Sequence, residues 1–321
     1  MSGCVQRTLL GAAGVALFLA AGCCLADLAP GDYTFAVMQK GRSRSYIVHS
    51  PQAASATSKA VIINMHGGGG NARNQQSYSR MDALADREGF LAVYPNGTGR
   101  FGDHLLTWNA GTCCGSAQKD NVDDVGFVRA VVDDLAKRTP IDRNRVYATG
   151  LSNGAMMVYR LAAEAPDLVA AIAPVAGAMV LPSFNPKRPV PIMHIHSVDD
   201  PRALYAGGLG PAFPLTNSRV QHPAVEDVIA RWVEFDGCAK PPRVDPPIQG
   251  KGKTAQHTAT RMTYAPCKQG VAVVLWKLTG AGHVWPGGRL DYLPRVLGPG
   301  TDVIDANEQM WKFLSRFRLD R

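Results

Sequence analysis

Gly150-Leu151-Ser152-Asn153-Gly154 is the stretch of sequence that decides the fold of this chain. Residues 145–149, which precede it, are typical of a strand, and residues 155–161, which follow it, are typical of a helix. A G-x-S-x-G segment in that context predicts a tight turn that lifts the serine hydroxyl clear of a sheet, with small residues where strand and helix approach closely. The alternative is a glycine-rich turn with a bystander serine. The chain has 33 glycines, so the flanking strand and helix carry the prediction.

Apolar strand-like runs alternate with helical stretches on both sides of this segment. The alternation predicts the α/β class, with a mostly parallel central sheet and helices on both faces. Loop-rich insertions interrupt it at residues 182–188, 207–222 and 240–253, and none has the composition of an interdomain linker, so residues 27–321 are expected to form a single domain. The expected strands are 33–37, 45–49, 60–66, 91–94, 145–150, 169–174, 190–196 and 271–278, and the expected helices are 78–88, 122–138, 154–164, 224–235 and 306–317.

Composition excludes several other classes of protein. Hydrophobic residues make up 46% of the 321 residues and charged residues 19%, which is enough apolar material for a large core and too little charge for a disordered chain. The net charge of +8 comes from scattered residues with no basic run. Because nucleic-acid binding needs clustered positive charge, no nucleic-acid partner is expected.

The first 26 residues predict export. Arg7 provides a positive start, residues 9–21 are apolar or small, and cleavage after Ala26 would fit a signal peptidase. The apolar stretch is shorter than the 20 or so residues that a membrane span needs. The segment ending at Cys23 also resembles a lipobox, although the usual Leu or Val is missing, so a lipid anchor through Cys23 stands as the alternative to soluble secreted or periplasmic export.

Cysteine usage agrees with an oxidising compartment. Cleavage after Ala26 would leave four cysteines, Cys113, Cys114, Cys238 and Cys267. A Cys238–Cys267 bridge is the preferred pairing, because the intervening loop is rich in Pro, Gly and Lys. Cys113 and Cys114 are adjacent and could form a vicinal disulfide. A zinc site is disfavoured because no second CxxC or histidine pair lies nearby at ligand spacing.

A nucleophilic serine needs a base, and His283 has the best position of the eight histidines. Where the chain order is serine, acid, histidine, the base follows a late strand. His283 comes shortly after the apolar run 271–278, and the neighbouring Gly280 and Gly282 let a loop return the imidazole towards Ser152. The other interpretation of a lone histidine is a satisfied core or surface residue.

The acid is expected on the loop after the strand at 190–196. Asp199 and Asp200 stand there side by side, and one of them would orient the imidazole and stabilise its charged form. The residues alone leave the choice open. His194 and His196 share one strand face beside these carboxylates, which also suggests a metal site, but no further histidine cluster completes it. A buried strand with a core histidine is the simpler interpretation.

The run from His66 to Gly70 follows the strand at 60–66 and predicts an oxyanion hole. A glycine-rich turn lets backbone N–H groups point at a developing oxyanion, and the N–H of Asn153, the residue after the nucleophile, would be the second donor. A phosphate-binding loop is disfavoured because no Gly-Lys-Ser/Thr follows.

Together these motifs resemble a known family, the bacterial polyhydroxybutyrate depolymerase and LpqC-like esterases, which are related to the feruloyl and acetylxylan esterases of carbohydrate esterase family 1. The resemblance covers nearly all of the chain after residue 26. It rests on His66-Gly-Gly-Gly-Gly-Asn-Ala72, Tyr94-Pro-Asn-Gly97, Trp108-Asn-Ala-Gly111, Cys113-Cys114-Gly115, Val122-Asp-Asp-Val-Gly-Phe127, Gly150-Leu-Ser-Asn-Gly-Ala-Met156, Asp236-Gly-Cys238 and Gly282-His-Val-Trp-Pro-Gly287.

The resemblance implies an α/β-hydrolase fold and a triad of Ser152, His283 and Asp200, because the family segment H-G-T-x-D-P aligns its aspartate with Asp200 rather than Asp199. It also implies that Gly68 supplies the first oxyanion donor. Ser197-Val198 replaces Gly-Thr here, which puts substrate preference in doubt.

Four further residues take their expected roles from the same motifs. Trp108 and Trp285 are candidate walls of the substrate pocket, although aromatic residues more often pack in a core. Asp123 and Asp124 are expected to cap a helix. A serine acyl-transfer mechanism requires no metal or organic cofactor, so none is expected.

The expected activity is two-step hydrolysis of a carboxylic ester, with poly(3-hydroxybutyrate) or its oligomers as the substrate that the family name suggests. A feruloyl or acetylxylan esterase is the first alternative. Two alternatives of other classes are a non-catalytic exported binding protein on the same fold and a metal-dependent hydrolase. Fold alone does not decide between substrates.

Overall fold

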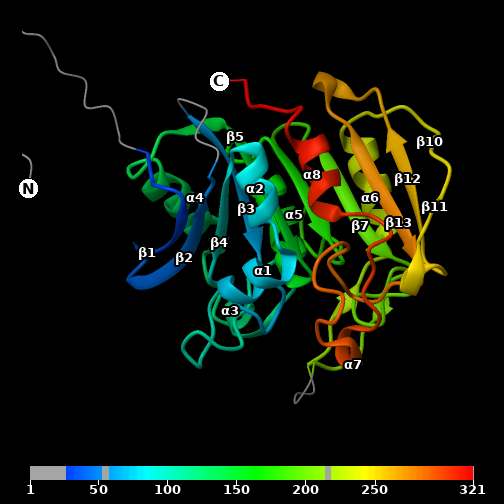
Figure 1. The fold of residues 1–321 in the computed structure, drawn as a ribbon, viewed down its shortest axis with the longest axis horizontal. Coiled ribbons are helices and arrows are strands. Elements are labelled where there is room, and N and C mark those ends of the chain that lie inside the picture. Colours follow the sequence, from blue (N-terminus) through cyan, green and yellow to red (C-terminus); the bar gives the residue numbers. More distant parts are fainter. Residues whose placement is uncertain (1–26, 53–57, 214–217, 321) are drawn as a thin grey trace, which may run out of the picture.

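A computed structural model of the chain describes residues 27–52, 58–213 and 218–320. The predicted signal peptide and Cys23 lie outside the described residues. The described residues form one eleven-stranded sheet in the order β1-β2-β4-β3-β5-β6-β7-β13-β12-β10, with β11 paired to β12 (Figure 1). A separate two-stranded sheet pairs β8 with β9. Within these ranges no helix combines the length and apolarity that crossing a bilayer requires.

The centre of the sheet is parallel and its two edges are antiparallel. Neighbouring strands from β4 to β13 pair in parallel, whereas β1–β2, β2–β4, β12–β13 and the pairs of β12 with β10 and β11 are antiparallel. β3, β4, β6 and β7 are buried at every position, as expected for strands covered on both faces. The strands are β1 Gly31–Gln39, β2 Arg42–Ser50, β3 Lys59–Met65, β4 Leu91–Pro95, β5 Ile141–Leu151, β6 Ala171–Val175, β7 Ile192–Ser197, β8 Gly208–Leu209, β9 Gln221–His222, β10 Arg243–Val244, β11 Ile248–Gln249, β12 Thr258–Tyr264 and β13 Val273–Thr279.

Helices cover both faces of the sheet and divide the core into two clusters. One cluster contains apolar residues of α4, α5 and α6, and the other contains those of α1, α2 and α8, which lie in front of the sheet in Figure 1. The α/β-hydrolase arrangement expected from the sequence is therefore confirmed. The helices are α1 Ala72–Ser79, α2 Asp82–Glu88, α3 Gly115–Lys119, α4 Asp124–Leu135, α5 Asn153–Glu164, α6 Val225–Phe235, α7 Pro294–Leu297 and α8 Ala306–Leu314.

The fold contains elements that the sequence does not predict, namely α3, α7 and the β8–β9 pair, and two further differences have a clear physical reason. The helix expected over 78–88 is instead two helices, because Arg80 takes a left-handed conformation that ends α1 before α2 begins. The sequence predicts a loop at residues 240–253 and no strand at residues 254–264. The structure instead has β10, β11 and β12 there, at one edge of the sheet. An edge strand is half solvated and carries a weaker apolar pattern, which explains the omission.

Disulfides connect two pairs of cysteines. The Cys238–Cys267 bridge joins the segment after α6 to the segment after β12, as the preferred pairing predicted. Adjacent Cys113 and Cys114 are also bonded to each other, across a cis peptide.

The topology brings four loops to one edge of the sheet. Parallel strands point their carboxyl ends the same way, and binding sites of open α/β sheets lie at that edge. β3, β5, β7 and β13 each end just before a segment that the sequence analysis singled out. These segments begin at His66, Ser152, Asp199 and Gly280.

Candidate active site

Ser152 lies on the tight turn that the sequence predicted. It has φ 57° and ψ −119°, between the end of β5 and the start of α5, and its backbone N–H donates to the Val175 carbonyl at 2.9 Å. Positive φ is costly for a residue other than glycine and persists only where the surroundings impose it. The turn therefore holds Ser152 at the carboxyl edge of the sheet.

Glycines surround this turn because no side chain would fit there. A Cβ on Gly150 would lie 2.8 Å from the Met65 carbonyl oxygen, and a Cβ on Gly154 would lie 2.6 Å from that of His66. A Cβ on Gly177, just after β6, would collide with the Ser152 carbonyl. The G-x-S-x-G pattern is thus a packing requirement between β5, β3 and α5 as well as a sequence signature.

His283 and Asp200 meet at the same edge. The Nδ1–H of His283 donates to Asp200 Oδ2 at 2.7 Å, and both residues are buried. The other carboxylate oxygen, Oδ1, accepts the backbone N–H groups of Arg202 at 2.7 Å and Ala203 at 2.8 Å. These bonds fix the carboxylate, and the carboxylate fixes the tautomer and orientation of the imidazole.

The pair also decides between the two adjacent aspartates. Asp199 is exposed, and its Oδ2 accepts the Gly280 N–H at 2.7 Å, so it stabilises the loop after β13. Asp200 is the residue that holds His283. Burial by itself would raise the pKa of Asp200, but the nearby His283 and the hydrogen bonds from His196 and His283 outweigh burial and hold the pKa well below its usual value.

The loop that carries His283 returns across the sheet towards Ser152. It leaves β13, and two residues after His283 the Trp285 N–H donates to the Tyr78 hydroxyl of α1 at 2.9 Å. α1 packs on β3 and β4, on the far side of β5 from β13 in the strand order, so the loop that carries His283 extends from β13 to the β3–β4 side of the sheet. Among the described residues the Ser152 hydroxyl makes no hydrogen bond, so the structure shows no direct bond between Ser152 and His283.

His66 locks the glycine-rich loop after β3. Its Nδ1 bonds the Gly67 carbonyl at 2.8 Å and its Nε2 accepts the Gly97 N–H at 3.0 Å. Complete burial lowers the pKa of His66 to about 4, so the ring is neutral, with its proton on Nδ1. The sequence analysis did not predict this structural role, because it considered His66 only as the first residue of the glycine-rich run that ends at Gly70.

Gly68 and Asn153 are neighbours, as an oxyanion hole requires. A Cβ on Gly68 would lie 3.5 Å from Asn153 Cβ, and a Cβ on Gly67 would lie 3.5 Å from Ser152 Cβ. Asn153 begins α5, so its N–H has no acceptor within the helix. Across the described part of the chain the Gly68 N–H likewise has no protein acceptor. Two backbone donors are thus available beside Ser152.

The side chain of Asn153 also fixes the loop that contains Trp108. Its Oδ1 accepts the Trp108 N–H at 2.7 Å and its Nδ2 donates to the Trp108 carbonyl at 3.1 Å. The indole N–H of Trp108 donates to the His66 carbonyl at 2.9 Å. These bonds tie the loop at 107–114 to both sides of the candidate oxyanion hole.

The two tryptophans predicted as pocket walls lie inside the core. Trp108 is 0% exposed and Trp285 is 1% exposed. The Trp285 indole N–H donates to Asn307 Oδ1 at 3.0 Å, at the start of α8. In this conformation neither indole offers a surface that a substrate could contact, and their contribution is to hold the loops on which the candidate site is built.

Asp123 and Asp124 behave differently from each other. Asp123 caps α4 as expected, accepting the Gly126 N–H at 2.8 Å. Asp124 is instead fully buried, pairs with Arg44 at 2.6 Å, and accepts the Asn109 N–H at 2.7 Å. The cap prediction is therefore wrong for Asp124, which anchors the residue next to Trp108.

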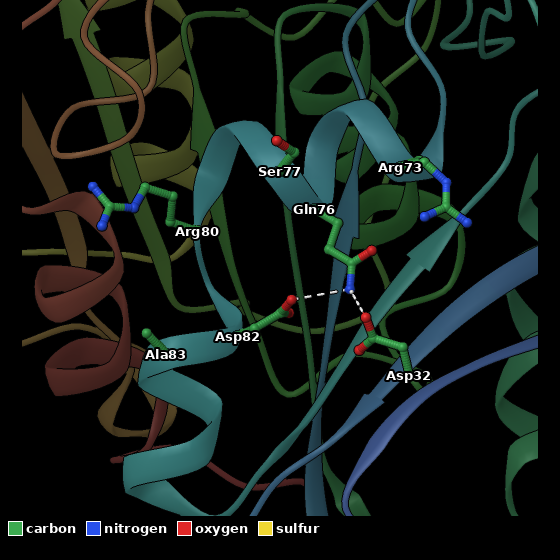
Figure 2. Close-up of a pocket in the computed structure, with 7 residues that line it drawn as sticks. All are labelled: Asp32, Arg73, Gln76, Ser77, Arg80, Asp82 and Ala83. Atoms are coloured by element: carbon green, nitrogen blue, oxygen red, sulfur yellow. Dashed lines mark hydrogen bonds between the residues drawn. The ribbon is translucent and has the colours of Figure 1, made fainter.

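A second cluster of a histidine and carboxylates lies away from this edge, beside a surface depression of about 400 Å³. Within the described residues, Asp32, His49 and Asp82 are the group whose ligand atoms come close enough together to hold a metal ion. Gln76 Nε2 donates to Asp32 at 3.0 Å and to Asp82 at 2.9 Å, as Figure 2 shows. His49 bonds Asp32 at 2.7 Å and Asp86 at 3.1 Å. We call Asp32, His49, Gln76, Asp82 and Asp86 the clasp, because they connect β1 and β2 to α1 and α2.

The sequence matches a known family over residues 44–234, described as "Esterase PHB depolymerase". The putative esterase NocK of Nocardia uniformis subsp. tsuyamanensis is 32% identical over 82% of this chain and 76% of its own length. The bifunctional acetylxylan esterase/xylanase XynS20E of Neocallimastix patriciarum is 30% identical over 88% of this chain, and feruloyl esterase B of Piromyces equi is 27% identical over 78%. This chain spans only 34% and 44% of those two relatives.

Solved structures support the fold at lower sequence identity. An acetyl xylan esterase from Aspergillus awamori aligns over 88% of this chain and 99% of its own, with a TM-score of 0.55 and 14% identity. A dienelactone hydrolase-like promiscuous phosphotriesterase, P91, from metagenomic libraries aligns over 91% of this chain and 100% of its own, with a TM-score of 0.56 and 14% identity. At such identity the likeness concerns the fold alone.

Proposed function

This chain belongs to the PHB depolymerase esterase family, and from that membership we propose that it is an exported serine esterase with Ser152, His283 and Asp200 as its catalytic triad. The observation that carries the proposal is the 2.7 Å hydrogen bond from His283 Nδ1 to the buried Asp200, at the sheet edge where Ser152 sits on its strained turn. A base held in one tautomer beside a raised serine is the arrangement that acyl transfer needs.

The proposed mechanism has two steps. Because Nδ1 of His283 carries the proton that Asp200 accepts, Nε2 carries the lone pair and can take the proton of the Ser152 hydroxyl. The serine oxygen attacks the ester carbonyl, and His283 then gives the proton to the leaving alcohol. Water, deprotonated by the same imidazole, attacks the acyl-enzyme and releases the acid. The ionised Asp200 stabilises the imidazolium at each stage.

The N–H groups of Gly68 and Asn153 would hold the negative charge that develops on the carbonyl oxygen. Their adjacency beside Ser152 supports this role, and backbone donors preorganised in this way are worth several kcal/mol in the transition state, roughly 3–4 for a single donor. His66 and Asn153 keep the two loops in place through their side chains.

The candidate substrates are hydroxybutyrate polyesters or oligomers and, as the alternative, feruloyl or acetyl esters of plant polysaccharides. Apolar side chains next to the oxyanion loop favour an apolar acyl group. Leu105 is 62% exposed and approaches Gly69, and Phe213 lies 3.7 Å from where a Gly68 Cβ would be. The similarity to the acetylxylan esterase/xylanase XynS20E and to feruloyl esterase B favours the carbohydrate-linked alternative.

We propose export through the predicted signal peptide at residues 1–26, with soluble release rather than a lipid anchor at Cys23. The Cys238–Cys267 bridge supports an oxidising compartment. Comparing the purified full-length precursor with protein recovered from culture medium and periplasm, by N-terminal sequencing, would test cleavage after Ala26. A lipid-modified N-terminal cysteine would reject the soluble form.

The decisive experiment compares wild type with Ser152→Ala on p-nitrophenyl butyrate, methyl ferulate and 3-hydroxybutyrate oligomers. We expect hydrolysis of at least one ester, and a fall in kcat/KM of about 10⁴-fold or more in the variant. The ester with the highest kcat/KM identifies the substrate class. A Ser77→Ala variant, on the exposed side of α1, serves as the matched control and should keep wild-type rates.

Each contrary outcome supports a different alternative. Equal activity of wild type and Ser152→Ala would reject the nucleophile assignment. Loss of activity on addition of a chelator, with retention in the variant, would favour a metal-dependent hydrolase. Two folded proteins that are inert on every ester would favour a binding protein on an esterase fold.

A further inference from the structure

A continuous line of buried side chains runs from α5 to the candidate triad acid. The Tyr159 hydroxyl lies 2.9 Å from His194 Nδ1, and His194 Nε2 lies 3.0 Å from His196 Nδ1. His196 Nε2 lies 2.8 Å from the Ala203 carbonyl oxygen and 3.2 Å from Asp200 Oδ2. Tyr159 and His194 are fully buried and His196 is 2% exposed. The histidine pair that suggested a metal site in the sequence is therefore part of a hydrogen-bonded chain.

The end of this chain fixes the position of every proton along it. The Ala203 carbonyl and the ionised Asp200 carboxylate can only accept, so His196 Nε2 must carry hydrogen. In a neutral ring Nδ1 of His196 is then an acceptor, which requires hydrogen on Nε2 of His194. Nδ1 of His194 is an acceptor in turn and receives the Tyr159 hydroxyl proton. All three protons point towards Asp200.

Burial keeps His194 and Tyr159, the first two members of the chain, uncharged. It lowers the pKa of His194 well below the usual value, and the neighbouring His196 lowers it further. Burial also raises the pKa of Tyr159, so its hydroxyl keeps its proton. With both nitrogens of each imidazole engaged in hydrogen bonds, neither ring has a lone pair to offer a metal.

The chain connects the two elements that carry the nucleophile and the acid. Tyr159 lies on α5, which begins directly after Ser152, and His194 and His196 lie on one face of β7, which ends just before Asp200. The Nε2–H of His196 reaches both the carboxylate and the turn that cradles it, because Ala203 also donates its N–H to Asp200 Oδ1.

We propose that Tyr159, His194 and His196 form a one-directional hydrogen-bond chain that positions Asp200, and through it His283, for ester hydrolysis. The proposal rests on the proposed function of the triad. The three are positioning residues, because the hydrogen bonds of the chain lead to Asp200 and not to Ser152. Because His196 directs an N–H at a buried carboxylate, losing that donor removes a hydrogen bond to a charged group, an effect of about ten- to a hundredfold in an equilibrium or a rate.

The first test reads the protons directly. Two-bond ¹H–¹⁵N correlation spectra of the ¹⁵N-histidine-labelled protein distinguish the two tautomers of each ring, and His194→Gln and His196→Gln identify the signals. At pH 8 we expect both rings in wild type to carry hydrogen on Nε2 only. In Tyr159→Phe the constraint on His194 is lost, and a mixture of tautomers is expected. Hydrogen on Nδ1 of His196 in wild type would overturn the chain.

The second test measures its effect on turnover. His196→Gln keeps an amide N–H near the position of Nε2, whereas His196→Leu removes the donor. With concentrations corrected by active-site titration, we expect kcat to fall about ten- to a hundredfold in His196→Leu at nearly unchanged KM, and most of it to return in His196→Gln. Tyr159→Phe should fall between wild type and His196→Leu.

These outcomes separate the chain from a structural role and from the proposed function. Equal kcat in His196→Leu and wild type, or equal losses in His196→Leu and His196→Gln, would overturn the positioning role. An inert wild type would instead reject the proposed function, while the spectra would still decide whether the chain of protons exists.

Discussion

The molecule contains two clusters in which histidine meets aspartate, and they differ in the ratio of the two residue types. In the clasp one histidine, His49, faces Asp32, Asp82 and Asp86. At the carboxyl edge of the sheet one carboxylate, Asp200, faces His196 and His283. The first cluster sits at the surface beside an open depression, and the second is buried.

The ratio determines the charge that each cluster carries. Burial would lower the pKa of His49, but its three carboxylate neighbours outweigh burial and raise it, so the clasp favours a charged imidazole and works as an ion pair. At the sheet edge the carboxylate is the charged partner and the pKa of His194 is lowered by burial. A buried anion of this kind can stabilise the positive charge that the proposed acyl transfer would place on His283, whereas the charges of the clasp are already paired.

The sharpest test of this contrast replaces one aspartate in each cluster. Asp200→Asn should lower kcat/KM by about 10³- to 10⁴-fold, because an amide no longer fixes the imidazole tautomer or stabilises its charge. Asp82→Asn, in the clasp, should change kcat/KM less than about twofold, since it touches no group of the proposed triad. Initial rates on p-nitrophenyl butyrate give the kcat/KM of both variants. Comparable losses in the two variants would erase the distinction.

A second comparison concerns steric room near each cluster. Gly154→Ala places a methyl group against the carbonyls of Met65 and His66 and should destabilise the fold by about 2–4 kcal/mol. Gly41→Ala, in the hairpin that connects the two clasp strands, meets nothing within 4 Å and incurs only the strain of φ +76°, about 1 kcal/mol. Urea denaturation at neutral pH measures both, and the reverse order would show that the turn at Ser152 is less tightly packed than described.

Acid should destabilise the sheet edge, where His66 is buried in its neutral form. The folded-state pKa of His66 is about 4, below its unfolded value, so the stability that its neutral state contributes is complete above about pH 6.5 and is lost as the pH falls towards 4. The expected loss is about 3 kcal/mol for this group. Burial lowers the pKa of His222 to about 4 as well, so His222→Gln should reduce the loss, whereas a change at the exposed His104 should not.

The clasp should show the opposite pH dependence with the smallest amplitude. The pKa of His49 is raised in the folded state, so its contribution is complete below the unfolded value near pH 6.5 and is lost as the pH rises through the folded value. His49→Gln should therefore destabilise the protein by about 1 kcal/mol at pH 5.5 and by less at pH 8.5. Equal destabilisation at both pH values would mean that His49 contributes hydrogen bonds without charge.

The sequence by itself determined the parts of this protein that follow from local pattern. Continuous apolar runs predicted the central strands, because strands that are buried on both faces need apolar residues at every position. Helical stretches between them predicted most of the helices. The glycines around Ser152 specified the tight turn, since backbone contacts there leave no room for Cβ atoms. The pairing of Cys238 with Cys267 also followed from the sequence, from a loop composition that suits a staple.

Only the tertiary structure decided which side chains face one another. From the residues alone Asp199 and Asp200 were equivalent, and it is the returning loop of His283 that selects Asp200 and leaves Asp199 to bind Gly280. The sequence around Trp108 and Trp285 does not distinguish a residue that lines a pocket from one that packs in the core, and the structure places both in the core. In the sequence, the spacing of His194 and His196 also fits a metal site. In the structure the hydroxyl of Tyr159, 35 residues from His194 in the chain, hydrogen-bonds His194 Nδ1, so all four ring nitrogens have partners. Such roles depend on contacts between distant segments, and no local periodicity or spacing encodes those contacts.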